Sequence, residues 1–314
     1  RTNKGIATII DNSKINHSPT STDLGYIIGP QLNAASRIND SSLSSKLLIS
    51  KSLIEIESIS KKLILLNEKR KIIENNIYEQ VLNQAKNQVN EKIILVHGFG
   101  WHKGVLGIIA SRLVEKFNKP SIVISEDQKF GIGSARSIEK IDLGNMILKA
   151  KNEGLLINGG GHSMAAGLKI KNDLIEKFHN YLIKKIEKFD QTIFEKINLY
   201  DIKLSINEIN LDLLEYIEKL EPFGKGNEEP SFIVYGLKID HYKIIKDKHL
   251  LIFFKSDFGN NIRAISFNCI GTKLGENLIN NKFSDFEFGC NIKRNNFNND
   301  LQPQLIIKDA LIIN

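Results

Sequence analysis

The sequence is poor in the residues that build covalent or metal-bound frameworks. It has only two cysteines, Cys269 and Cys290, which form no CxxC pair and no cluster with histidine. Disulfide-stapled scaffolds and structural zinc sites show several such residues at short spacings, so the sequence argues against both. We therefore expect a protein of the reducing cytoplasm without structural zinc.

Long hydrophobic runs are also absent. No segment approaches the ~18 uninterrupted apolar residues of a membrane span, so none is predicted. The beginning, RTNKGIATII, has neither an initiator methionine nor the apolar core of a signal peptide, and we interpret it as the middle of a longer protein. The length of 314 residues and the charged fraction of 25% predict two or three globular domains.

Arginine is scarce, although the chain is basic. The formal net charge is +7, and only seven of the 43 basic residues are arginine. The positive excess lies in residues 1–190, which hold 28 basic and 19 acidic side chains. A basic surface suits an anionic partner such as nucleic acid, although ordinary solvation of lysines accounts for the charge by itself. Arg37, Arg112 and Arg136 lie in or beside glycine-bearing stretches, where a planar donor suits phosphate.

One stretch without glycine or proline predicts a long helix. Neither residue occurs between positions 31 and 97, and Ser52 followed by Glu55 forms a capping-box pattern. Apolar residues then recur close to helical spacing, which predicts one helix over about 52–89. At 1.5 Å per residue this helix would span roughly 55 Å, which is more typical of a bridge between domains than of one core. A hairpin of two shorter helices is the alternative.

Two regions with different patterns follow this helix. Between about residues 91 and 190 strands alternate with helices, which predicts an α/β domain. After residue 200 come five short β-rich runs with polar turns: FIVYGLKI, HLLIFFKS, NIRAISFN, FEFGCNIK and QLIIKDALI. They predict a small β-barrel of the OB type, with a β-sandwich as the alternative. The fold class is thus α/β plus all-β, divided into an N-terminal tail and hinge, the long helix, the α/β domain and the barrel, over 1–50, 51–89, 90–190 and 195–314.

Three short stretches hold candidate binding residues. In GSARS, Ser134 and Arg136 alternate, so on a strand they share one face and form a small phosphate grip. In GWHKG, His102 lies at the start of a predicted helix, whose free N–H groups bind anions. In NGGGHSMAAG, three glycines let a substrate or a domain approach the backbone beside His162, a possible hydrogen-bond donor or proton carrier. The structural alternatives are an exposed polar strand, a loop closed by a buried Trp101, and a satisfied histidine.

The order of these stretches resembles that of a known family. GWHKGVLGIIASRL, GSARS and GGGHSMAAGL follow one another as in the DHH-associated domain of the DHH phosphoesterase superfamily. GYIIGPQLNAASRIND before them and LEPFGKGNEEPSF after them narrow the resemblance to RecJ-like 5′→3′ exonucleases, and it covers essentially the whole chain. The sequence departs from the family pattern where Gln31 replaces an arginine and Ser36 a glycine, while Asn33 and Arg37 remain.

The resemblance implies a metal-dependent enzyme of which this chain is one part. RecJ-like proteins hold manganese or magnesium through an N-terminal DHH domain, whose motifs do not occur here, so the metal ligands are expected outside this chain. His162 is the expected catalytic residue, because it can stabilise charge on the phosphate while the metals supply the nucleophile. The residues expected to bind single-stranded DNA are Asn33, Arg37, His102, Ser134, Arg136, Gly160 and Gly161.

The resemblance also implies what surrounds the site. The long helix would hold the metal domain and the DHH-associated domain across a cleft, and the barrel would guide the strand, with Tyr235, Phe253 or Phe267 available for stacking. Expected partners are single-stranded DNA and a helicase or single-strand-binding protein in DNA repair and recombination, with no membrane. Two alternatives stay open: a catalytically inactive DHH-family nucleic-acid-binding protein, and a phosphodiesterase for short oligonucleotides. The barrel favours a longer polymer.

Overall fold

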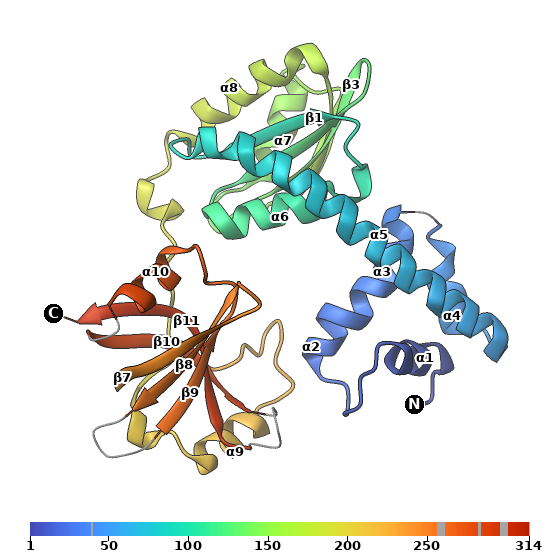
Figure 1. The fold of residues 1–314 in the computed structure, drawn as a ribbon. Helices are drawn as coiled ribbons and strands as arrows, with labels where there is room; N and C mark the ends of the chain where they lie inside the picture. The colour runs from blue at the N-terminus through green and yellow to red at the C-terminus, as the bar shows by residue number, and fades with distance from the viewer. Residues whose placement is uncertain (39, 256–260, 282–283, 296–300, 314) are drawn as a thin grey trace. The chain divides into compact units, whose positions relative to one another are not determined.

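The computed structural model describes residues 1–38, 40–255, 261–281, 284–295 and 301–313. These residues form two units with separate cores, Arg1–Lys196 and Ile197–Asn314, which Figure 1 shows in blue to yellow-green and in yellow to red. Among the described residues, no helix combines the length and the apolar character that crossing a bilayer requires.

The first 38 residues, which the sequence analysis assigned to an N-terminal tail and hinge, are largely helical. They form α1 (Lys4–Asn12), α2 (Ser21–Asp23), a π-helical turn (Leu24–Ile28) and α3 (Gly29–Ile38), and α4 (Ser42–Ile49) follows. The polar residues start helices: the Asn3 side chain accepts the N–H of Ile6, and Thr20 forms a capping box with Asp23. Pro30 lies in the first turn of α3, where a missing N–H costs little.

Residues Leu53–Ala85 form one continuous helix, α5, so the long helix is confirmed and a helical hairpin is excluded. It begins at Ser52, whose side chain accepts the N–H of Glu55. Its buried face is apolar at both ends: Ile56 and Leu63 pack with the N-terminal helices, while Ile77 and Val81 pack against the first sheet. The middle of this face is polar and buried, and consists of Asn67, Arg70 and Glu74.

The predicted α/β domain is a five-stranded sheet with helices on both faces. Its strands run in the order β1-β2-β3-β5-β4, with β1 and β2 parallel and the others antiparallel. The strands are β1 (Ile94–Phe99), β2 (Ser121–Glu126), β3 (Phe130–Arg136), β4 (Asn158–His162) and β5 (Ala165–Lys171). The helices are α6 (Leu106–Phe117) on the α5 side of the sheet, and α7 (Leu143–Asn152) and α8 (Ile175–Ile186) on the other side (Figure 1).

Both edges of this sheet are formed in unusual ways. The glycine run, for which the sequence predicted no strand, forms the edge strand β4, because its backbone pairs with all of Ala165–Lys169 in β5. At the other edge, Gln84 and Gln88 take the place of a neighbouring strand. Each glutamine amide both donates to and accepts from one β1 residue, Gln84 with His97 and Gln88 with Leu95, at 2.8–3.2 Å. These bonds fix α5 to the sheet and block further pairing there.

The second unit closes into a small barrel. Its sheet has the order β10-β11-β9-β8-β7-β6, and an additional β10–β7 pairing completes a ring of five strands, which bears out the OB-like prediction. The strands are β6 (Ile202–Ser205), β7 (Phe232–Ile245), β8 (His249–Lys255), β9 (Asn261–Ser266), β10 (Asp285–Arg294) and β11 (Pro303–Ile313). Helices α9 (Leu211–Lys219) and α10 (Lys273–Asn280) were not predicted, and Ser256 of the second predicted run lies outside the described residues. Cys269 and Cys290 are buried free thiols.

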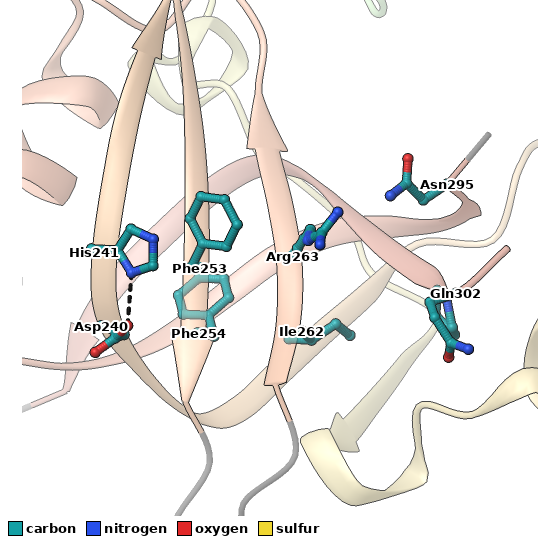
Figure 2. Close-up of a pocket in the computed structure, with 9 residues that line it drawn as sticks. Asp240, His241, Phe253, Phe254, Ile262, Arg263, Asn295 and Gln302 are labelled. Atoms are coloured by element: carbon teal, nitrogen blue, oxygen red, sulfur yellow. Dashed lines mark hydrogen bonds and ion pairs between the residues drawn. The ribbon is translucent and has the colours of Figure 1, made fainter. Parts of the chain in front are cut away.

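A hollow of the barrel is lined by residues of β7, β8 and β9 and by Asn295, Gln302 and Pro303 beside the ends of β10 and β11. Its walls include His241, Phe253, Phe254 and Arg263, and its volume is about 390 Å³ (Figure 2). The His241 ring stacks on Phe253 with a centroid distance of 4.3 Å and an interplanar angle of 8°. The Arg263 guanidinium lies 5.8 Å from the Phe253 ring centre. The barrel therefore carries an aromatic platform with positive charge beside it.

Candidate nucleic-acid interface

One face of the first sheet is left open over three of its strands. Helices α5 and α6 cover β1 and β2 on this side, while alternate residues of β3, β5 and β4 are exposed or half-exposed. Strand register aligns these residues in cross-strand rows, and paired residues point to the same face. We call this surface the open sheet face; its members are Ile132, Ser134, Arg136, Asn158, Gly160, His162, Ala165, Gly167 and Lys169.

Ser134 and Arg136 lie where the open sheet face meets the N-terminal end of α6. The predicted alternation on a strand is present, and the Arg136 guanidinium donates to Ser134 Oγ at 3.3 Å and to the Ala135 carbonyl at 2.9 Å. Gly107, in the first turn of α6, lies directly above them. A Cβ there would approach Arg136 Nη2 to 2.9 Å and Ser134 Oγ to 3.2 Å. A hydroxyl, a guanidinium and helix N–H groups thus converge, a combination that suits a phosphate.

Arg37 reaches the same place from the end of α3. Its Nη1 donates to the Gly104 carbonyl at 3.2 Å, and a Cβ on Gly104 would lie 2.0 Å from the Arg37 carbonyl oxygen. Burial and then the charge of Arg37 lower the pKa of Arg136, so the two guanidinium groups repel each other. Asn33 lies one turn before Arg37 on α3 and is exposed. Gln31 is turned inward and donates to Ser13, so it does not reach this cluster.

The bonding partners of the arginines distinguish this cluster from the ion pairs that only stabilise the fold. Arg1, Arg70, Arg112 and Arg294 each pair with a carboxylate. Within the described residues, Arg37 and Arg136 bond only to backbone carbonyls and to Ser134. Two adjacent cations without an acid are costly to hold together unless an anion joins them.

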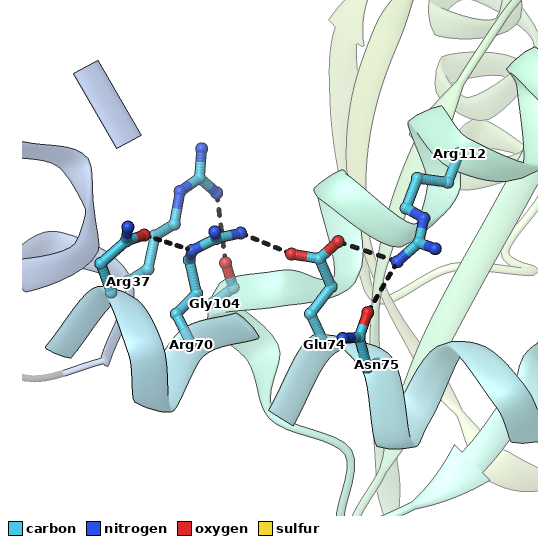
Figure 3. A network of polar contacts seen from close by, with 7 residues as sticks. Arg37, Arg70, Glu74, Asn75, Gly104 and Arg112 are labelled. Carbon is cyan, nitrogen blue, oxygen red and sulfur yellow. Dashed lines mark hydrogen bonds and ion pairs between the residues drawn. The ribbon is translucent and has the colours of Figure 1, made fainter. Parts of the chain in front are cut away.

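Arg112 has a structural place, contrary to its grouping with the phosphate-binding arginines. Figure 3 shows Glu74 of α5 between Arg70 and Arg112. Arg112 Nη1 lies 3.0 Å from Glu74 Oε1 and 3.3 Å from Asn75 Oδ1, and its guanidinium stacks 3.6 Å from the Tyr78 ring centre. Arg112 therefore fastens α6 to the polar middle of α5.

His162 lies on the open sheet face in the row that contains Arg136. The register aligns Arg136, Ala165 and His162 across β3, β5 and β4. The turn after His162 is held by α7, since the Leu143 N–H donates to the Ser163 carbonyl at 3.1 Å. Gly144 allows this close approach, because a Cβ there would lie 2.5 Å from the His162 carbonyl oxygen. The imidazole is exposed, so it is available to a ligand.

The three glycines of β4 do not play equal parts. Gly160 points to the open sheet face opposite Gly167, and nothing lies within 4 Å of a Cβ built there. Gly161 points the other way, where a Cβ would lie 2.3 Å from the Ala165 carbonyl oxygen. The open sheet face therefore has no side chains at Gly160 and Gly167, and we call these two positions its bare floor. Gly161 is needed instead because a side chain there would clash with β5.

His102 and Trp101 organise the loop before α6. His102 Nδ1 accepts the N–H of Gly104 at 3.2 Å at the start of the short 3-10 helix Lys103–Val105, which leaves Nε2–H as a donor in the neutral ring. Trp101 is buried and its indole donates to Gln80 at 3.1 Å, so it closes the loop as the structural alternative supposed.

Comparisons with known proteins agree with this architecture. Residues 86–197 match the DHHA1 domain, and residues 200–309 match the RecJ OB domain. The chain therefore contains a DHHA1 domain followed by a RecJ OB domain. The RecJ exonuclease of Haemophilus influenzae is 30% identical over 300 residues, covering 92% of this chain and 51% of that protein. The RecJ of Bacillus subtilis is 28% identical over 301 residues, covering 92% of this chain and 37% of that protein.

A solved RecJ structure shares the fold of this RecJ-like chain. The crystal structure of Thermus thermophilus RecJ with Mn2+ superposes with a TM-score of 0.81 at 24% identity, over 99% of this chain and 44% of that one. The chain thus spans about half the length or less of the relatives it matches.

A divalent metal does not fit the residues of this RecJ-like chain. Among the described residues, no group of three or more histidines, cysteines, aspartates or glutamates is placed to hold a metal ion. The residues of the open sheet face include two cations, Arg136 and Lys169, and no carboxylate, a charge that favours an anion over a metal ion.

The sequence did not mark all of the residues of the open sheet face. Asn158, Gly167 and Lys169 of this face were missed, and so was Gly107 of α6, which lies above Ser134 and Arg136. Lys169 and Gly167 alternate with buried residues along AAGLKI, and this alternation was the available signal. Asn158 becomes visible only through its pairing with Lys169 across the sheet.

Proposed function

We propose that this chain is the substrate-holding part of a RecJ-like exonuclease that degrades single-stranded DNA from the 5′ end. The observation that carries the proposal is the cluster of Arg37, Ser134 and Arg136 at the start of α6, in which the two arginines contact no carboxylate of the described chain. A terminal phosphate fits such a site, because it accepts several charge-assisted hydrogen bonds at once.

The neighbouring residues then have complementary tasks. Asn33 lies one turn before Arg37 on α3, and His102 lies in the loop before α6 with its Nε2–H free. Both side chains would add donors to the cluster. The bare floor at Gly160 and Gly167 lets the sugar and base lie against the backbone. His162 lies on this same face, and its imidazole would stabilise negative charge on the phosphate or hold a proton during cleavage. Gly161 contributes by allowing the strand to pack as it does.

The barrel carries a surface of its own that suits unpaired bases. His241 and Phe253 form a stacked pair beside Arg263 (Figure 2). Exposed aromatic rings next to cations bind unpaired bases without sequence preference. Tyr235 and Phe267 are 41% and 54% exposed and are further candidates for stacking. This surface favours a polymer over a short oligonucleotide.

The rest of the enzyme would come from outside these residues. A divalent ion, manganese or magnesium, would supply the nucleophile and would be held by ligands of another domain. The reduced, buried Cys269 and Cys290 suit a cytoplasmic enzyme of DNA repair and recombination. A helicase or a single-strand-binding protein would be its natural partner.

Binding measurements test this proposal directly. The chain should bind a short, 3′-labelled single strand with a 5′ phosphate more tightly than the 5′-hydroxyl strand or the blunt duplex, as measured by fluorescence anisotropy, and should hydrolyse none of them. In a protein that also contains the metal domain, His162→Ala should lower kcat more than it raises KM. Equal affinity for all three ligands would contradict the proposed function.

A further inference from the structure

A second anion-binding position adjoins the phosphate cluster on the open sheet face. A hollow of about 460 Å³ lies beyond Ser134, lined by Ile132, Asn158, Gly159, Gly160, Gly167, Leu168 and Lys169. The register aligns Ile132, Lys169 and Asn158 in one row, and Ser134, Gly167 and Gly160 in the next. The row of Ile132, Lys169 and Asn158 therefore lies one strand repeat, roughly 6.7 Å, from the row of Ser134.

The polar groups of this hollow are donors. Asn158 Oδ1 accepts the N–H of Gly159 at 3.0 Å, so its amide presents N–H groups. Lys169 is exposed, and its Nζ lies 5.0 Å from the centre of the Phe130 ring. The nearby carboxylate of Asp127 accepts the N–H groups of Lys129 and Phe130, and it forms no ion pair with Lys169 within the described chain. An ammonium and an amide beside an apolar Ile132 suit an anionic group attached to an organic body.

The surface between Arg136 and Lys169 is mostly bare backbone. The row between these two residues has glycine at two of its three positions, Gly160 and Gly167, and Ser134 at the third. A sugar or base can therefore lie flat on the backbone while phosphates on either side reach separate donors. A linear polyanion with one charge per nucleotide matches this repeat of donor, bare floor and donor.

We propose that Lys169 and Asn158 form a second phosphate subsite, which receives an internal phosphate of the strand that is held at its 5′ end. This inference rests on the proposed function, because it assumes that Arg136 and Ser134 hold the terminal phosphate. The chain then engages the terminal phosphate and an internal one, and the second subsite distinguishes an oligonucleotide from a mononucleotide.

The test compares salt dependences of binding. Lys169→Ala should weaken binding of a 5′-phosphorylated oligothymidylate about tenfold, the effect of losing one charge-assisted contact of ~1.5 kcal/mol. It should also reduce the slope of log K against log salt by about 0.7, the value of one phosphate on a single strand. Lys169→Arg should retain the slope, and competition by thymidine 5′-monophosphate should be the same for wild type and Lys169→Ala.

Lys149→Ala is the matched control. Lys149 is an exposed lysine of α7, which covers the opposite face of the sheet, so its loss should leave the slope unchanged. If Arg136→Ala weakens binding while Lys169→Ala behaves like Lys149→Ala, the second subsite is refuted and the proposed function stands. If the wild-type chain does not bind the phosphorylated strand, both are refuted.

Discussion

Replacing Arg136 with alanine should separate ligand binding from stability. Arg136 donates hydrogen bonds to Ser134 and to the Ala135 carbonyl, and the remaining N–H groups of its guanidinium stay available to a ligand beside Gly107. Loss of a hydrogen-bonded charge on a phosphate costs about 1.5–3 kcal/mol, or roughly 10- to 150-fold in affinity. Because burial and the neighbouring Arg37 lower the pKa of Arg136, its charge is unfavourable in the folded chain without a ligand. Arg136→Ala should therefore not lower the melting temperature.

Arg112→Ala is the opposite case in the same unit. Arg112 contacts Glu74, Asn75 and the ring of Tyr78, and Glu74 is only 8% exposed. Its removal leaves a buried carboxylate with Arg70 as the remaining cation, which costs about 1–3 kcal/mol. For a unit of this size, a loss of ~2 kcal/mol lowers the melting temperature by about 4–8 °C. Binding of the phosphorylated strand should stay at the wild-type level while the protein is folded.

The assay pairs anisotropy with thermal unfolding on the same preparations. The account predicts that Arg136→Ala loses affinity and keeps its melting temperature, while Arg112→Ala loses melting temperature and keeps affinity. If both variants lose stability and affinity in parallel, Arg136 is a structural residue and the reasoning from unpaired arginines is wrong.

Three further predictions concern the framework around the site. Gly144→Ala should destabilise the first unit by on the order of 1–2 kcal/mol through overpacking against the His162 carbonyl, although alanine is the better helix former. The control is Gly25→Ala, where nothing lies within 4 Å of the new Cβ. Equal denaturant midpoints for the two variants would contradict this prediction. The double variant Gln84→Ala/Gln88→Ala should speed amide hydrogen exchange at Leu95 and His97. The Val96 amide, which is not bonded to either glutamine, should stay protected. Unchanged exchange at all three amides would show that the glutamines do not protect this edge of the sheet. Burial lowers the pKa of His179 more than the attraction of Glu91 raises it, so the unfolded chain binds more protons below pH ~6.5. The unfolding free energy should then fall as pH drops below ~6.5, and His179→Gln should flatten this fall in urea titrations at several pH values.

Local patterns in the sequence were sufficient for most of the fold. The capping pattern at Ser52 and the absence of glycine and proline identified α5 as one helix, and alternation in GSARS placed Ser134 and Arg136 on one face of a strand. Five β-rich runs indicated the barrel, since each has the length and polar boundaries of a short strand. These features depend on neighbours within a few residues, so one sequence contains them.

Features set by distant partners could not be predicted in this way. Arg112 and Arg136 look alike in sequence, and only the contact with Glu74, 38 residues away, makes Arg112 structural. The glycine run has a low intrinsic preference for strands and becomes β4 because β5 pairs with it and α7 packs on it. Asn158 joins the open sheet face only through its cross-strand pairing with Lys169, which the sequence does not encode locally.

NMR on the isotope-labelled chain can map the bound phosphate and so show whether the open sheet face holds the DNA. Addition of a 5′-phosphorylated single strand should shift the amide signals of Gly107, Ser134, Arg136, Gly160 and Gly167, and these shifts should disappear in Arg136→Ala. If the shifts are confined to α7 and α8, or to residues after 197, then the open sheet face does not hold the DNA and the account is wrong.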